Sequence, residues 1–417
     1  MERGESTGQT GLWRWPPPLA LVWLVVPVAG VVLRLAFAPV NPHDYWWTLA
    51  MGRMIAEAGS IPESNLFLYT LPADAPFVDQ PWLAQWLLYV LYEIGGDAGP
   101  FVLRSLVGAA TWTGLLWVAC RRGADPRVAG GFALLGVVLS ASLFAVRTQL
   151  FALPIYAATV CILLEVAEGG LDRRWLVALV AMVAVWSNLH GSFVLAPVLV
   201  GLVGGASVVG AALDGNESEP TGVARWLAVL VAVGLAGMAN PLGPGVYAYV
   251  WQLAVESNVA STVTEWQPPN PADPFGMVVI GGILAGAVVL LVRRRAVTLV
   301  EVVIFGATTY LAADAVRSLF WWVAPAMMIV PVHLTGLLDA GAWEKAETTS
   351  LQGSVHALVI VGLTVGSVLV HPGLPGFGVR TAAIEGMVRV SGEGEGLLSR
   401  RHPTELVERL AAEGTSG

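Results

Sequence analysis

The chain has 417 residues, of which 56% are hydrophobic and only 12% are charged. A soluble globular protein carries about a quarter charged residues, so this composition excludes an ordinary soluble domain and favours a membrane protein. The net charge of -8 comes with no basic patch, so we expect no nucleic acid among the partners. The 17 tryptophans suit helix ends at a lipid–water interface, and we expect the lipid bilayer itself to be a partner.

Apolar stretches separated by short polar connectors recur along the chain, and stretches of this length can cross the hydrocarbon core of a bilayer. They predict an all-α fold, a polytopic transmembrane helical bundle with about eleven spans. The predicted spans are 19–38, 99–120, 128–146, 149–167, 174–189, 192–213, 224–239, 275–292, 297–313, 319–338 and 355–371. The segment 82–94 is apolar but short, which predicts an interfacial or re-entrant helix instead.

The distribution of Lys and Arg predicts the orientation, because cytoplasmic connectors carry an excess of both. With the N-terminus inside, the N-terminus and the inner connectors carry twelve Lys and Arg, whereas the outer connectors and helix ends carry five. We therefore expect a cytoplasmic N-terminus over residues 1–18 and a transmembrane domain over 19–371, with a short tail over 372–417 on the outer face. The two long outer loops are then about 39–98, which carries the interfacial helices, and about 240–274.

Residues of specific chemistry fall on the predicted outer face. Asp44 comes directly after the first predicted span, in His43-Asp44-Tyr45-Trp46-Trp47. One interpretation of Asp44 is a solvated acid beside tryptophans that anchor the chain at the interface. The other is a functional residue, which acts as a catalytic base or binds an acceptor or a metal. Arg53 continues the same segment and faces either lipid phosphates or a substrate phosphate.

Two arginines lie at the outer ends of apolar segments, Arg147 and Arg317. An arginine at mid-membrane costs about 2.5–3.5 kcal/mol on insertion scales, so one interpretation is that both side chains reach for the interface. The alternative is that both bind a phosphate, because a guanidinium pairs with phosphate through two parallel hydrogen bonds.

His190 and Glu265 complete the set of outer-face residues. His190 in Asn188-Leu189-His190-Gly191 is either a packed, hydrogen-bonded residue or a ligand. Glu265 in the second long loop is either a solvated acid or a binder of an acceptor or a cation. The sequence has no P-loop, dinucleotide fingerprint, serine triad or zinc spacing. Polar groups at the outer ends, in place of paired broken helices at mid-membrane, favour surface chemistry over translocation.

The string from Asp44 to Tyr92 resembles the first outer loop of the C-type (GT-C) membrane glycosyltransferases, in an uncharacterised bacterial branch. The residues that carry the resemblance are Asp44, Trp47, Gly52, Arg53, Ile61, Pro62, Trp82 and Leu83. The later strings RTQLFALP, NLHGSF, NPLGPG and TEWQPP follow in the expected order, so the resemblance covers roughly residues 15–340. It implies a GT-C-like fold and a sugar donor linked to a polyprenyl phosphate.

The resemblance also implies roles. Asp44 would be the catalytic base, and Arg147 and Arg317 would neutralise the lipid phosphate, with Arg53, His190 and Glu265 as further substrate-binding residues. The expected function is transfer of a sugar to an unidentified acceptor at the outer face of the bacterial cytoplasmic membrane. The alternative is a non-catalytic membrane protein, either a transporter subunit or a component that assembles or ligates cell-envelope polymers.

Two departures from the family pattern bear on activity. The family often carries a pair of acids in the first loop, whereas here His43 precedes Asp44. A divalent cation held by Asp44 with His43, His190 or Glu265 is one alternative, and no other cofactor is expected. Many members also carry a folded outer C-terminal domain, of which the tail 372–417 resembles only the beginning, so we expect a truncated domain or a separately encoded one.

Overall fold

The structure is a computed structural model that describes residues 18–38, 44–65, 67, 70–169, 172–213, 220–256, 263–338, 349–369 and 371. Across these ranges the regular elements are helices, apart from one isolated bridge between Ser64 and Pro76. The prediction of an all-α fold is therefore confirmed for this part of the chain. His43, the first 17 residues and the tail 372–417 lie outside the described residues.

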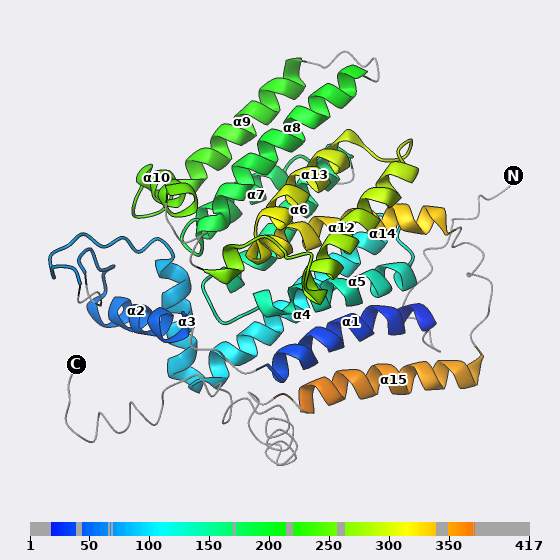
Figure 1. Ribbon diagram of the computed structural model, residues 1–417, viewed down its shortest axis with the longest axis horizontal. Helices are drawn as coiled ribbons and strands as arrows, with labels where there is room; N and C mark the ends of the chain where they lie inside the picture. Colours follow the sequence, from blue (N-terminus) through cyan, green and yellow to red (C-terminus); the bar gives the residue numbers. More distant parts are fainter. Residues whose placement is uncertain are drawn as a thin grey trace, which may run out of the picture.

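Most of the helices follow one another with short connections, and the main exceptions are the long loops before α3 and α12 (Figure 1). They are α1 (Leu19–Ala36), α2 (Tyr45–Ala58), α3 (Trp82–Gly95), α4 (Ala98–Arg121), α5 (Pro126–Ser140), α6 (Gln149–Ala167), α7 (Trp175–Trp186), α8 (Leu195–Leu213), α9 (Pro220–Gly237), α10 (Gly245–Trp251), α12 (Pro274–Val292), α13 (Leu299–Asp314), α14 (Leu319–Leu337) and α15 (Ser350–Leu369). Short helical turns lie at η1 (Ala141–Leu143), η2 (Gly191–Val194), η3 (Gln252–Glu256), η4 (Thr264–Trp266) and η5 (Val316–Ser318).

Eight helical segments of the described chain are long and apolar enough to cross a membrane, which indicates a multi-pass membrane protein. They are Leu19–Ala36, Ala98–Arg121, Pro126–Leu143, Gln149–Ala167, Gly191–Leu213, Pro274–Val292, Val316–Leu337 and Ser350–Leu369. Each of the eleven predicted ranges coincides with a helix. Helices α7 and α13 have only 12 and 16 residues, however, and the apolar part of α9 is also short. At 1.5 Å per residue α7 is about 18 Å long against a core of about 30 Å, so the number of spans stays a prediction.

Helix α14 is the centre of the bundle and packs against α4, α5, α6, α12 and α13. Its sequence is apolar on all sides, as expected for a helix surrounded by other helices. Phe320, Trp322 and Met327 are fully or almost fully buried. Helices α1 and α15 run side by side along one edge of the bundle, and α8 and α9 pair at another (Figure 1). This packing leaves the helix ends to carry the polar residues.

The first long loop forms a helical pair, α2 and α3, at one end of the bundle (Figure 1). The two helices pack closely because Gly52 has no Cβ to meet the backbone of Gln85. The Tyr45 hydroxyl donates to the Asp97 carboxylate at 2.6 Å, which ties α2 to the start of α4. We name this side the Asp44 end, and the far end of the 24-residue α4 the Arg122 end, about 36 Å away.

Candidate functional site

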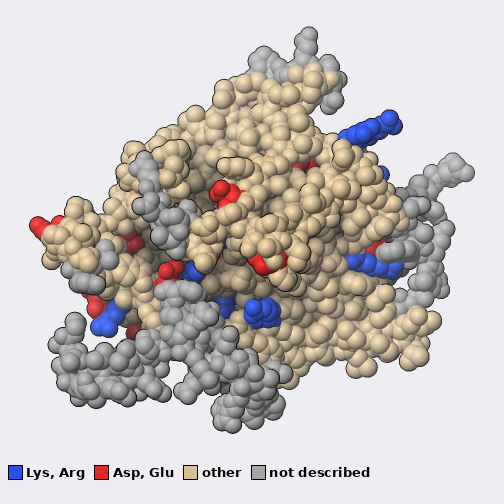
Figure 2. Space-filling view, in the orientation of Figure 1, with Lys and Arg blue, Asp and Glu red and all other residues tan. Residues whose placement is uncertain are grey.

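Four charged side chains from distant parts of the chain meet at the Asp44 end. Arg147 donates from Nη1 and Nη2 to the two carboxylate oxygens of Glu265, at 3.0 and 3.2 Å. Arg147 Nε lies 3.9 Å from Asp44 Oδ2, and Arg317 Nη1 lies 4.0 Å from Glu265 Oε1. Charged side chains are sparse on the face drawn in Figure 2, and several gather around a hollow near its centre. Four of the residues selected from the sequence therefore form one cluster, which we call the charge cluster.

The charge cluster is open to solvent on its acidic side. The Asp44 side chain is 65% exposed and that of Glu265 34%, whereas those of Arg147 and Arg317 are 19% and 23% exposed. The two arginine side chains are thus more buried than the two carboxylate side chains that contact them.

Contacts between η4 and η5 position the loop that carries Glu265. The guanidinium of Arg317 lies over the Trp266 ring, 4.0 Å from its centroid, a cation–π contact. The backbone N–H of Val316 donates to the Gln267 carbonyl at 3.0 Å. At the end of the same loop the Asp273 carboxylate caps α12 by accepting from the Gly276 N–H at 2.7 Å. The second long loop is therefore docked on the start of α14.

Arg104 binds the C-terminal end of α1. Its Nη2 donates to the carbonyls of Leu35 and Ala38, both at 2.6 Å. These carbonyls belong to the last turn and the exit of α1, where helical partners are missing. The side chain of Arg104 on α4 thus caps the end of α1.

His190 lies beside the charge cluster as a neutral imidazole. Burial, together with the positive charges of Arg317 and Arg147, lowers the pKa of His190 to about 3. Its Nδ1 accepts from the Ser192 backbone N–H at 3.1 Å, so the neutral ring carries its proton on Nε2. His190 can then act as a hydrogen-bond donor to an anion without carrying charge.

The end of the first loop is buried against the connections α7–η2 and α9–α10. Trp82 Nε1 donates to the Asn188 carbonyl oxygen Oδ1 at 2.7 Å, and Asn240 Nδ2 donates to the Ser187 carbonyl at 2.9 Å. Gln80 also donates to the Ser187 carbonyl. These contacts join the loops that carry Asp44 and His190. Asn240 therefore has a structural role in this network.

Asp79 is an acid in this buried layer that sequence reasoning missed. Only 6% of its surface is exposed, and its Oδ2 has no hydrogen-bond partner in the described structure. Burial raises the pKa of Asp79 to about 6, against a smaller lowering by a hydrogen bond from Gln85. The local sequence does not signal this burial, because the neighbouring Gln80 is held by the Ser187 carbonyl, more than 100 residues away.

Arg53 does not join the charge cluster. It lies on α2, and its Nε forms an exposed ion pair with Glu57 at 2.8 Å. For the divalent cation considered as an alternative, no group of three His, Cys, Asp or Glu side chains among the described residues is placed to hold a metal. Glu265 is committed to Arg147, and His43 lies outside the described residues.

A second ionic network lies at the Arg122 end. Arg122 donates from Nη1 and Nη2 to the two carboxylate oxygens of Glu168, at 2.8 and 3.0 Å, and from Nη2 to Glu301 at 2.8 Å. The other oxygen of Glu301 lies 3.0 Å from His333 Nε2. The side chains of Arg122 and Glu301 are only 5% and 3% exposed. The sequence analysis assigned no role to the residues of this network.

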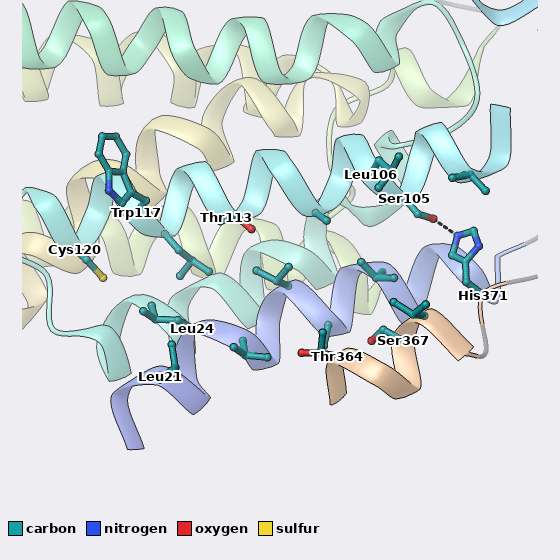
Figure 3. Close-up of a pocket in the computed structure, with 18 residues that line it drawn as sticks. Leu21, Leu24, Ser105, Leu106, Thr113, Trp117, Cys120, Thr364, Ser367 and His371 are labelled. Carbon is teal, nitrogen blue, oxygen red and sulfur yellow. Dashed lines mark hydrogen bonds between the residues drawn. The ribbon is translucent and has the colours of Figure 1, made fainter. Parts of the chain in front are cut away.

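An apolar cavity of about 710 Å³ lies between α1, α4 and the end of α15 (Figure 3). Leu24, Leu106 and Trp117 are among its lining side chains, and at one end His371 Nε2 lies 2.8 Å from Ser105 Oγ. No residue of the charge cluster lines it. The cavity is therefore separate from the charge cluster.

A search against models of protein families finds no match to the chain, and neither does a comparison with curated proteins. The functional argument therefore depends on the chemistry of the site.

Proposed function

We propose that the protein is a glycosyltransferase of the bacterial cytoplasmic membrane, with a GT-C-like fold. It transfers a sugar from a polyprenyl-phosphate-linked donor to an acceptor at the outer face of the membrane. The observation that supports this proposal most is the meeting of Asp44, Arg147 and Arg317 at one end of a bundle of apolar helices. These three residues come from segments that are far apart in the sequence.

The arginines suit the leaving phosphate. In the proposed reaction an acceptor oxygen attacks the anomeric carbon, the bond from this carbon to the phosphate oxygen breaks, and its electron pair stays on the phosphate. Arg147 and Arg317 stabilise the negative charge that develops there. The neutral His190 adds a hydrogen-bond donor from Nε2.

Asp44 suits the acceptor. Its carboxylate is exposed at the mouth of the cluster, and it takes the proton that the acceptor oxygen loses in the reaction. Attack from the side opposite the phosphate inverts the configuration at the anomeric carbon. In this proposal the base, Asp44, lies on the water side of the reacting bond, and the positive charges of the arginines lie on its protein side.

The rival hypothesis is a non-catalytic membrane protein, such as a transporter subunit or an assembly component. One observation favours it, namely that the charges of the cluster are paired with each other, as in a structural ion pair. The described core between the two ends of α4 counts against a transport route, because it is mostly apolar, with large side chains such as Trp112 and Met327 fully buried in it.

The test is transfer from a radiolabelled polyprenyl-phosphate sugar by the purified protein in nanodiscs, with an extract of envelope glycans and lipids as acceptor. We expect Asp44→Asn to lower the rate by about 10²–10⁴-fold, the usual contribution of a general base. Asp74→Asn, an exposed acid of the same loop, is the matched control. Wild-type transfer that survives Asp44→Asn would remove Asp44 from the mechanism, and no transfer from any such donor would favour the rival hypothesis.

A further inference from the structure

We infer that Glu265 is a built-in anion of the site, which a ligand phosphate must displace from Arg147 in order to bind. This inference rests on the proposed function, because it takes the ligand to be the phosphate of a lipid-linked donor. It makes Glu265 a positioning residue that acts through Arg147 and sets which anions the site accepts.

The geometry of the Arg147–Glu265 pair is the geometry of phosphate recognition. Both guanidinium nitrogens Nη1 and Nη2 donate, at 3.0 and 3.2 Å, to two oxygens held by one central atom. A phosphate presents two oxygens to a guanidinium in the same way. The Oε1 atom of Glu265 also lies 4.0 Å from Arg317 Nη1, so the carboxylate lies between both arginines. Carboxylate and phosphate would therefore compete for one place.

The net charge of the cluster depends on whether Glu265 occupies this place. Arg147 and Arg317 carry two positive charges, and Glu265 and Asp44 carry two negative charges, so the cluster is neutral as it stands. A phosphate that approached the intact cluster would meet two carboxylates over the arginines. Once Glu265 has turned away, the arginines and Asp44 leave one net positive charge. The cluster attracts an anion only in this second arrangement.

Glu265 can turn away while its loop stays in place. The neighbouring Trp266 packs on Arg317, and the Gln267 carbonyl accepts from the Val316 N–H at 3.0 Å. Both contacts hold the backbone of η4 on the start of α14. The Glu265 side chain is 34% exposed, so rotation about its own bonds brings the carboxylate into water. Displacement therefore needs a side-chain movement and no opening of the fold.

The experiment measures binding of farnesyl phosphate and of inorganic phosphate to the full-length protein in nanodiscs by isothermal titration calorimetry. We expect Glu265→Gln to bind farnesyl phosphate about tenfold more tightly than the wild type, because Arg147 loses its charged competitor. Glu265→Ala should act in the same direction and serves as the second variant. Glu57→Gln, which removes an exposed acid paired with Arg53, is the matched control and should leave the affinity unchanged.

A double-variant comparison separates displacement from a general loss of structure. In the background of Arg147→Gln, the further change Glu265→Gln should give a smaller gain in affinity than in the wild type, because the bidentate contact to Arg147 is gone and only the longer contact to Arg317 remains. A gain of full size in this background would overturn the inference. Equal or weaker binding by both Glu265 variants would also overturn it, since Glu265 would then not compete with the ligand.

The outcomes also separate this inference from the proposed function. If Arg147→Gln weakens binding while the Glu265 variants bind like the wild type, displacement is wrong and the phosphate site stands. If inorganic phosphate binds as tightly as farnesyl phosphate and gains equally from Glu265→Gln, displacement holds and the lipid-linked donor is wrong. If neither probe binds the wild type or any variant, both proposals fail.

Discussion

Arg147 and Glu265, which are 118 positions apart in the sequence, form a bidentate ion pair. The pair joins the connection before α6 to the loop before α12, and Arg317 lies against the same carboxylate. Two other titratable groups at this end of the protein, His190 and Asp79, have shifted pKa values. Their environments can be measured directly.

The protonation of His190 is the first prediction. Because burial and two arginines lower its pKa to about 3, we expect His190 to stay neutral at pH 5, with its proton on Nε2. The neutral form is preferred in the folded state, so this group stabilises the fold above pH 6.5 and the contribution is lost as the pH falls towards 3. Nitrogen-15 NMR of labelled histidine should show one neutral imidazole at pH 5 that is missing in His190→Gln. An imidazole that titrates near 6.5 at this position would contradict the assignment.

Asp79 gives a prediction of opposite sign. Its pKa is raised from 3.8 to about 6, so the folded state holds a proton over this range that the unfolded state has lost. Stability should therefore fall as the pH rises from about 4 to about 6 and stay level above that. We expect Asp79→Asn to stabilise the protein at pH 7 by up to about 3 kcal/mol, with no gain at pH 3.5.

The measurement for Asp79 is unfolding by SDS titration in mixed micelles at several pH values. Asp74→Asn, in the exposed part of the same loop, is the control and should change stability little at any pH. A pH-independent gain for Asp79→Asn would mean that packing, and not the charge, limits stability at this position.

The ionic network at the Arg122 end gives a prediction about stability alone. Arg122→Ala leaves the buried carboxylate of Glu301 without its guanidinium partner, and breaking a buried pair in this way costs about 3–5 kcal/mol. Arg174→Ala is the control, because the Arg174 side chain is 81% exposed and its pair with Asp172 is loose. The same SDS titration compares the two variants, and equal effects would show that the buried network contributes no more than a surface pair.

Packing between α2 and α3 gives the last prediction. An alanine at Gly52 would place its Cβ against the carbonyl of Gln85, so we expect Gly52→Ala to cost about 1–3 kcal/mol and to separate the two helices. Gly30→Ala in α1 is the control, since a Cβ there meets nothing within 4 Å and should raise stability by up to about 1 kcal/mol. Thermal unfolding in nanodiscs ranks the two variants, and a Gly52→Ala protein as stable as the wild type would contradict this packing.

The helices were predictable because apolar runs and their polar breaks are local signals. The N-cap residues Asp125 and Asp273, each followed by proline, mark the starts of α5 and α12 in the sequence itself. The residues of the charge cluster were predictable for a related reason. Charged residues are so few in this chain that those at helix ends stand out, and Asp44, Arg147 and Arg317 were selected on that ground.

The partners of the charged side chains were not predictable, because they depend on which helix ends lie next to each other in the fold. The sequence does not show that Glu265 takes both nitrogens of Arg147, or that Arg53 stays with Glu57. The Arg122 network was missed although a signal existed. Glu301 lies within an apolar segment, and an acid in such a place needs a partner, which Arg122 and His333 supply.

The ion pair between Arg147 and Glu265 also constrains the order of events while the chain is being made. The ribosome adds about 5–20 residues per second, so Glu265 follows Arg147 by roughly 6–24 s. During that interval the guanidinium of Arg147 has Asp44, water and lipid headgroups as its available partners. The Arg147–Glu265 ion pair can therefore form only after synthesis has passed residue 265. A nascent protein stalled before that residue lacks the pair and should be a substrate for membrane quality control.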